Sequence, residues 1–132
     1  MLSGMAVIRI VSISGSLQAR SSNLSLVDSL SSLAGPEVEV TRWDGLRGLP
    51  HFDLDANEAP PPEVCAWRDV LRAADAVLIA TPEYGHSLPG ALKNGIDWVF
   101  SSGELYRKPV AITAASTGPG RGRRGIAALH QT

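Results

Sequence analysis

A chain of 132 residues in which 44% of the side chains are hydrophobic and 19% are charged can bury the core of one domain, and this composition excludes a disordered chain. The net charge of −1 gives no global support for binding nucleic acid or an acidic membrane. No apolar run approaches the roughly 20 residues of a membrane span, residues 1–5 lack the pattern of a signal peptide, and the single cysteine, Cys65, cannot form an internal disulfide. We therefore expect a cytoplasmic protein with no membrane or nucleic-acid partner.

The first third of the chain predicts a strand, a polar loop, a helix and a second strand. Residues 6–12 form a short segment rich in β-branched side chains, which is typical of a strand buried on both faces. The hydroxyl-rich loop 13–23 follows, and any of its last three residues can cap the next helix. Valines alternate with polar residues at 37–41, which predicts a second strand with one exposed face. The predicted buried stripe of the helix is Leu24, Val27, Leu30 and Leu33.

The middle of the chain predicts a long loop, a helix and a third strand. Residues 43–62 are rich in acids and prolines, and a loop of this length in a small domain is usually functional or mobile. Pro62 opens a helix that ends at Asp75, and 76–80 is an apolar run typical of a buried strand. The shared face of this helix consists of Val64, Trp67, Val70 and Leu71, and we expect Cys65 to be buried beside it.

The last third predicts one more strand between two helices. After the irregular loop 82–88, Pro89 occupies a first helical turn, and the helix extends to about Phe100. Residues 109–115 predict the fourth strand, 116–124 a polar loop, and Gly125 the start of a last helix. The apolar stripe of the first of these two helices is Leu92, Ile96 and Val99.

Regular alternation of strands and helices predicts an α/β fold, a doubly wound parallel sheet with helices on both faces, in a single domain spanning 1–132. In a sheet of order 2-1-3-4 the first, third and fourth strands are neighbours. The loops at their carboxyl ends, 13–23, 82–88 and 116–124, would then line one crevice, where open α/β sheets bind ligands.

The loop 13–23 has the chemistry of a phosphate cradle. Its hydroxyls and an arginine precede a helix, whose free N–H groups and dipole favour an anion. It matches neither the Walker A nor the G-x-G-x-x-G pattern, and an ordinary serine-rich cap and turn stays an even alternative. The polar side chains are those of Ser14, Ser16, Arg20, Ser21, Ser22 and Asn23.

The two other loops suit a flat heteroaromatic ring. Tyr84 and His86 can stack on or frame such a ring, and Gly85 allows close approach of the backbone. Glu83 has no evident catalytic partner, so we prefer a structural role in capping N–H groups. The glycines of 116–124 also suit close approach to a ligand. Its arginines, Arg121, Arg123 and Arg124, form either a site for the phosphate of a second nucleotide or, as the favoured interpretation, a solvated basic turn.

No pair of side chains has the pattern of a nucleophile and its base, and the spacing of His51, His86 and His130 does not predict a metal site. A site with a phosphate cradle and a ring-binding loop but no acid–base set points to a cofactor that carries the chemistry. No catalytic side chain and no metal ligand are therefore predicted.

At these residues the chain resembles the NAD(P)H-dependent FMN reductases of the flavodoxin-like superfamily, which include quinone, chromate and azo-dye reductases. The resemblance covers essentially the whole chain and is most specific at 82–85 (PEYG) and 89–98 (PGALKNGIDW). Residues 14–17 (SGSL), 108–110 (KPV) and 116–118 (STG) also fit.

The resemblance implies a flavodoxin-like fold, bound FMN, and hydride transfer from NADPH or NADH through FMN to a small-molecule acceptor such as a quinone or free flavin. It implies that Ser16, Ser21 and Asn23 hold the FMN phosphate, while 82–86 and 116–118 hold the ring and ribityl chain. The cofactor-binding candidates are Ser14, Ser16, Gln18, Arg20, Ser21, Asn23, Pro82, Glu83, Tyr84, Gly85, His86, Ser116, Thr117 and Gly118.

Two departures from the family pattern modify this expectation. Gln18 stands where the family usually has arginine, and Arg20 is the candidate replacement. The family's fifth strand and last helix are expected to be missing, which would leave strand four as an exposed edge. We therefore expect a homodimer or homotetramer in which a partner covers this edge. A flavin-binding or interaction protein without turnover, a shortened paralogue, is the alternative function.

Overall fold

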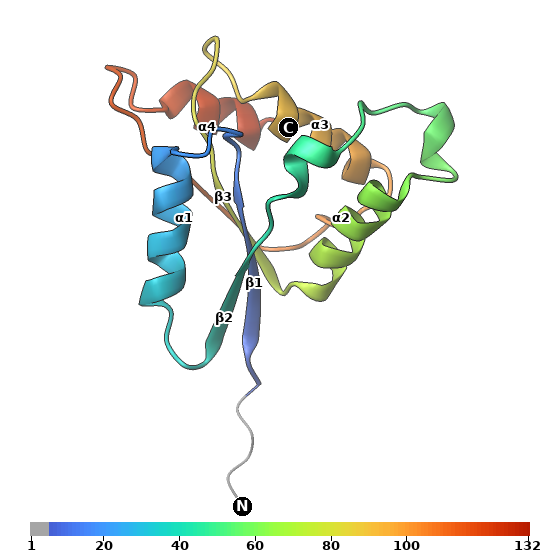
Figure 1. Cartoon of the computed structure of the whole chain (residues 1–132), viewed down its shortest axis with the longest axis horizontal. Coiled ribbons are helices and arrows are strands. Elements are labelled where there is room, and N and C mark those ends of the chain that lie inside the picture. Colours follow the sequence, from blue (N-terminus) through green and yellow to red (C-terminus); the bar gives the residue numbers. More distant parts are fainter. Residues whose placement is uncertain (1–5) are drawn as a thin grey trace, which may run out of the picture.

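The computed structural model describes residues 6–132, so the expectation about a signal peptide falls on residues outside this range. Figure 1 shows strands and helices alternating along the chain. The strands are β1 (Ile8–Ser14), β2 (Val38–Arg42), β3 (Ala76–Ala80) and β4 (Val110–Thr113). The helices are α1 (Ser22–Leu33), α2 (Pro62–Ala73), α3 (Gly90–Phe100) and α4 (Arg123–His130), with two short 3-10 helices, η1 (Gly45–Gly48) and η2 (Asp55–Asn57).

The four strands are parallel and form one sheet in the order β2-β1-β3-β4, which confirms the predicted strand order. Ser14, Ala80 and Thr113 are the last residues of β1, β3 and β4, and they are register partners across the sheet. The loops that follow these three strands therefore start side by side, at the carboxyl end of the sheet.

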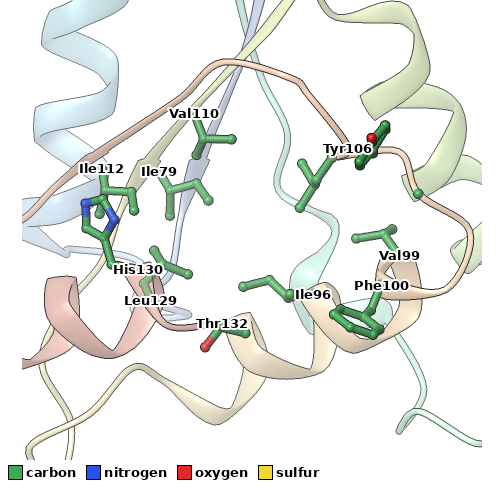
Figure 2. Close-up of a pocket in the computed structure, with 12 residues that line it drawn as sticks. Ile79, Ile96, Val99, Phe100, Tyr106, Val110, Ile112, Leu129, His130 and Thr132 are labelled. Atoms are coloured by element: carbon green, nitrogen blue, oxygen red, sulfur yellow. The ribbon is translucent and has the colours of Figure 1, made fainter.

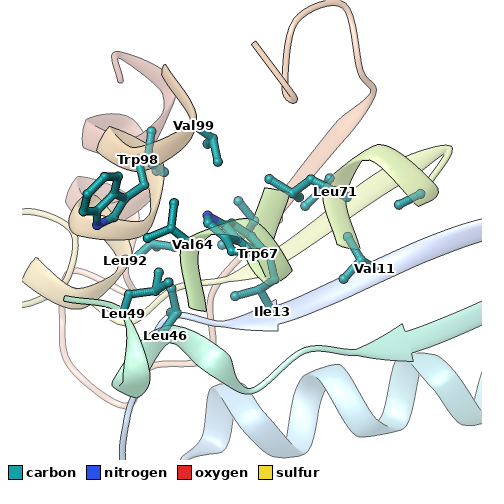
Figure 3. Close-up of a cluster of buried hydrophobic side chains, with 14 of the residues drawn as sticks. Val11, Ile13, Leu46, Leu49, Val64, Trp67, Leu71, Leu92, Trp98 and Val99 are labelled. Carbon is teal, nitrogen blue, oxygen red and sulfur yellow. The ribbon is translucent and has the colours of Figure 1, made fainter. Parts of the chain in front are cut away.

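The main hydrophobic core lies between the sheet and helices α2 and α3, whereas α1 packs on the other face (Figures 1 and 3). Val64, Trp67 and Leu71 of α2 are buried at helical spacing, as predicted. Trp67 stacks on Trp43, with ring centroids 4.1 Å apart. Burial of each large apolar side chain stabilises the fold by roughly 1.5–3 kcal/mol, so this cluster fixes α2 and α3 against β1 and β3.

The long segment between β2 and α2 is held in place by α3. Asn94 accepts a hydrogen bond from the N–H of Phe52 (2.7 Å) and donates one to the carbonyl of Pro50 (2.9 Å). Trp98 donates its indole N–H to the same carbonyl (2.8 Å), and the Phe52 ring meets the Trp98 ring edge-on. This loop is therefore an ordered part of the scaffold.

Several sequence-based expectations need correction. Strand β1 covers 8–14 where 6–12 was predicted, and its first residues, Ile8 and Arg9, are exposed. Cys65 is exposed, because α2 buries the stripe of Val64 and Trp67 and Cys65 lies beside it. Leu33 is 80% exposed at the end of α1, where it borders an open apolar groove.

Strand β4 pairs only with β3 among residues 6–132, as predicted for an edge strand. Apolar pockets flank it on both faces of the sheet, and Val110 of β4 lines both. Figure 2 shows the pocket on the α3 side, a volume of about 390 Å³ bordered by Ile96, Phe100 and Leu129 among others. No helix within residues 6–132 is both long enough and apolar enough to span a membrane.

The contacts of Asn94 generate a stability prediction. Asn94→Ala removes both hydrogen bonds to the 50–52 segment and leaves the Phe52 N–H without its acceptor. We expect the free energy of unfolding, measured in urea, to fall by about 1–3 kcal/mol. Lys93→Ala is the matched control, because this exposed neighbour on α3 pairs only with Asp97 and makes no hydrogen bond to the 50–52 segment, so its effect should be smaller. An alanine variant as stable as the original chain would contradict the role given to this side chain.

Candidate functional site

The three polar loops meet at the carboxyl end of the sheet, as the strand order predicts. The Asn23 side chain is 3% exposed and joins the first loop to the last: its amide donates to the carbonyl of Ala115 (3.1 Å) and accepts from the N–H of the same residue (2.9 Å). The hydroxyls of Ser16 and Tyr84 lie 3.4 Å apart and connect the first loop to the middle one. The structure thus brings the three loops together, but the predicted residues line two separate pockets: Ser14, Ser16 and Gln18 line one, and Glu83, His86, Ser116 and Gly118 line the other.

Serine side chains shape the loop between β1 and α1. Ser14 accepts the N–H of Ser16 (3.3 Å), and Ser16 accepts the N–H of Gln18 (3.2 Å). Ser21 is the N-cap of α1, where it accepts the N–H of Asn23 (3.2 Å). The backbone N–H groups of 19–22 have no acceptor anywhere in the part of the chain that the structure describes. A row of free donors thus precedes the positive end of α1.

An arginine that the sequence patterns did not single out supports this loop. Arg47 lies in the short helix η1, and its Nη2 donates a hydrogen bond to the carbonyl of Leu17 (2.6 Å). Gln18 is exposed and lines a pocket of about 310 Å³ together with Arg47. Arg42 lines the same pocket, but its hydrogen bonds to Asp28 and Asp44 raise the pKa of its guanidinium. No local pattern links residues 17 and 47, so only the tertiary structure reveals this contact.

A tight turn forms the tip of the loop after β3. Tyr84 and Ser87 exchange two backbone hydrogen bonds of 3.0 Å, and Gly85 and His86 between them have φ values of 55° and 63°. Positive φ at both central residues is the pattern of a type I′ turn. Within residues 6–132 the N–H groups of Glu83, Gly85 and His86 have no acceptor. The turn thus presents donors next to the half-exposed Tyr84 ring.

Glu83 has the structural role that the sequence favoured. One of its carboxylate oxygens accepts the backbone N–H of Arg124 (3.2 Å) in the first turn of α4. A β-carbon on Gly125 would lie 3.0 Å from the carbonyl of Pro82, so α4 packs directly on this loop. The cap extends α4 back to Arg123, two residues before its predicted start at Gly125. The Arg124 guanidinium also contacts the His86 ring.

The loop after β4 passes close to both neighbours. Ser116, Thr117 and Gly118 are exposed, and Ser116 accepts the N–H of Gly118 (3.2 Å). Gly122 has φ 75°, and a β-carbon there would lie 2.6 Å from that of Ala114, so no larger residue fits. A pocket of about 650 Å³ lies between this loop and the tip of the middle one.

Pro82 is half-buried at the exit of β3, and Arg20 is exposed on the first loop. No group of three or more His, Cys, Asp and Glu side chains in the described range could hold a metal ion. The apolar pocket of Figure 2 shares no residue with the polar loops.

The family model for NADPH-dependent FMN reductases matches residues 8–132. The chain belongs to this family. It is 38% identical over 128 residues to the NAD(P)H-dependent FMN reductase PA1204 of Pseudomonas aeruginosa, covering 95% of this chain and 69% of that one. It is 36% identical over 115 residues to a quinone reductase of Escherichia coli, covering 84% of this chain and 61% of that one.

A solved structure extends the similarity to three dimensions. FerB, a flavoenzyme NAD(P)H:(acceptor) oxidoreductase from Paracoccus denitrificans, superposes with a TM-score of 0.86 at 32% identity, covering 95% of this chain and 70% of that one. The fold of residues 6–132 is therefore that of the family. The chain spans only 61% of the length of the E. coli quinone reductase.

The contact between Glu83 and α4 generates a second prediction. Glu83→Ala leaves the Arg124 N–H without its acceptor, and loss of such a cap costs about 1 kcal/mol. We expect faster amide hydrogen exchange at the start of α4 with little change at β1. Glu83→Gln keeps an acceptor oxygen, so its exchange rate at the start of α4 should lie between those of the original chain and the alanine variant. Unaltered exchange in α4 of the alanine variant would show that the carboxylate does not cap this helix.

Proposed function

We propose that this chain is an FMN-dependent NAD(P)H oxidoreductase that passes a hydride from a nicotinamide through bound FMN to a quinone, a free flavin or a similar acceptor. The observation that carries the proposal is the convergence of the three loops at one end of the sheet, where the loops after β1 and β3 carry backbone N–H groups that have no acceptor within residues 6–132. Membership of the FMN reductase family supports the choice of cofactor.

The donors of the first loop fit the phosphate group of FMN. A phosphate needs several hydrogen-bond donors and favours the positive end of a helix. The free N–H groups of 19–22 and the hydroxyls of Ser16 and Ser21 meet both needs. Arg20 is the exposed cation of this loop and would add charge that Gln18 lacks. The Asn23 amide is paired with Ala115, so we give Asn23 a positioning role.

The donors of the loop after β3 fit the ring. The isoalloxazine system carries carbonyl and ring-nitrogen acceptors along its edge, which the N–H groups of Glu83, Gly85 and His86 could meet. Residues 116–118 would border its other side, and the exposed Tyr84 ring would flank the ribityl chain. When bound, FMN supplies the hydride chemistry, and the protein supplies placement and electrostatics.

Two titratable side chains of the loop after β3, Glu83 and His86, both make contacts within the protein. Glu83 caps α4, and the His86 ring contacts Arg124. Neither group is therefore placed as a free acid or base, which agrees with a reaction carried by the cofactor. The alternative is a flavin-binding protein without turnover, which is favoured by the neutral Gln18 in the phosphate loop.

We also propose a homodimer or homotetramer that works in the cytoplasm with a small-molecule acceptor. The exposed apolar side chains of Phe100 and Tyr106 support an assembly that buries them. The exposed, unpaired Cys65 supports a reducing compartment. Sedimentation that finds only a folded monomer would contradict the assembly.

The phosphate site makes a prediction for cofactor binding. Ser16→Ala and Ser21→Ala each remove one hydroxyl donor, and we expect each to weaken FMN binding about tenfold in a fluorescence titration. Ser29→Ala is the matched control, since its side chain is exposed on α1 outside this loop and should leave the affinity unchanged. Equal affinities for all four proteins would remove the assignment of this loop to the phosphate.

The reaction itself is tested with the FMN-loaded protein. We expect the oxidation of NADPH or NADH to depend on added quinone or free flavin. The oxidation is followed by the loss of nicotinamide absorbance at about 340 nm. A protein that binds FMN but leaves both nucleotides intact would support the alternative without turnover. A colourless protein that takes up no FMN would overturn both functions.

A further inference from the structure

A basic pocket adjoins the candidate flavin site. Of the 12 lysines and arginines in the chain, three lie within residues 121–124, although the net charge is −1. All three line the pocket of about 650 Å³ between the loops after β3 and β4. Glu83, His86, Ser116 and Gly118 line it too, so the pocket opens directly beside the loops assigned to the flavin ring.

The three arginines differ in what they contact. The Arg124 guanidinium contacts His86, and its backbone N–H is held by Glu83, the one carboxylate that lines the pocket. For Arg121 and Arg123, no carboxylate within residues 6–132 lies at ion-pair distance, and neither guanidinium makes a hydrogen bond there. Two exposed cations are thus available to a ligand in this pocket.

The backbone holds these two arginines in a defined place. The N–H of Arg121 donates to the carbonyl of Gly118, and that of Arg123 donates to the carbonyl of Gly120, both at 3.0 Å. Arg121 has φ 51°, and the next residue, Gly122, is packed against β4. The turn is therefore anchored on both sides, which lowers the entropy lost when its side chains bind a ligand.

We propose that Arg121 and Arg123 bind the 2′-phosphate of NADPH and give the enzyme a preference for NADPH over NADH. The inference rests on the proposed function and deepens it. The pocket adjoins the loop 82–86 assigned to the flavin ring, so the proposal places the adenosine end of the dinucleotide in it. NADPH carries a phosphate on the 2′ position of its adenosine ribose, where NADH carries a hydroxyl. Guanidinium groups bind phosphate through charge-assisted, often bidentate hydrogen bonds, and a neutral hydroxyl gains far less from them.

The FMN-loaded protein and three variants test this. Arg121→Asn suits the left-handed backbone at that position, because asparagine tolerates positive φ, and Arg123→Gln keeps a helix former at the start of α4. Arg107→Asn is the control, since Arg107 is also an exposed arginine with positive φ (57°) and does not line the pocket. We expect the ratio of kcat/KM for NADPH to that for NADH to fall about tenfold in each of the first two variants. The ratio should stay unchanged in the third.

A binding measurement separates this inference from the proposed function. Calorimetric titration with adenosine 2′,5′-bisphosphate and with adenosine 5′-monophosphate needs neither turnover nor FMN. We expect the bisphosphate to bind about tenfold more tightly, with the difference lost in Arg121→Asn and Arg123→Gln and kept in Arg107→Asn.

Two outcomes would overturn the phosphate site. The first is an active enzyme whose nucleotide preference does not change in either variant, or whose kcat/KM falls equally for both nucleotides, as expected for arginines that bind the shared pyrophosphate. The second is equal binding of the two adenosine nucleotides. A protein that oxidises neither dinucleotide overturns the proposed function, and the calorimetric comparison alone then decides on the phosphate site.

Discussion

The shared end point of three strands is the constraint on which the site depends. Ser14, Ala80 and Thr113 are paired in register, so the chain leaves β1, β3 and β4 at the same level of the sheet. Asn23 then ties the start of α1 to Ala115 with two hydrogen bonds, across 92 positions of sequence. Ala115 contributes only its backbone N–H and carbonyl to this link, so the link depends on the side chain of Asn23 and not on the side chain at position 115. The site is assembled by the sheet and closed by this side chain.

The stretch from Pro82 to Trp98, on which the family resemblance is most specific, has two physical roles. Its first part turns at Gly85 and faces the site. Its second part faces away, where Asn94 and Trp98 hold the 50–52 segment and Gly95 lets Leu46 approach closely. Specificity in a motif is therefore not the same as contact with a ligand, since half of this one serves the packing of the scaffold.

Local patterns predicted the features that depend on burial. The spacing of Val64, Trp67 and Leu71 gave the buried face of α2, and the apolar run 76–80 coincides with β3. The same patterns failed where a distant group decides. Glu83 caps the start of α4 from 41 positions away in the sequence. Arg47 donates a hydrogen bond to Leu17, which lies 30 positions away. Leu33 fits the apolar stripe of α1 but lies beside an open groove. Periodicity reports which face of an element is apolar, and it carries no information about what covers that face.

The cap that Glu83 places on α4 has a thermodynamic consequence for ligand binding. Glu83 belongs to the loop assigned to the flavin ring, and α4 carries Arg123 on the wall of the basic pocket. A ligand that orders one of these segments also restrains the other, and the second ligand then loses less conformational entropy when it binds. Linkage makes this effect reciprocal, so each ligand would raise the affinity of the other by the same factor. In the proposed enzyme, the Glu83 carboxylate would thus couple the two binding steps.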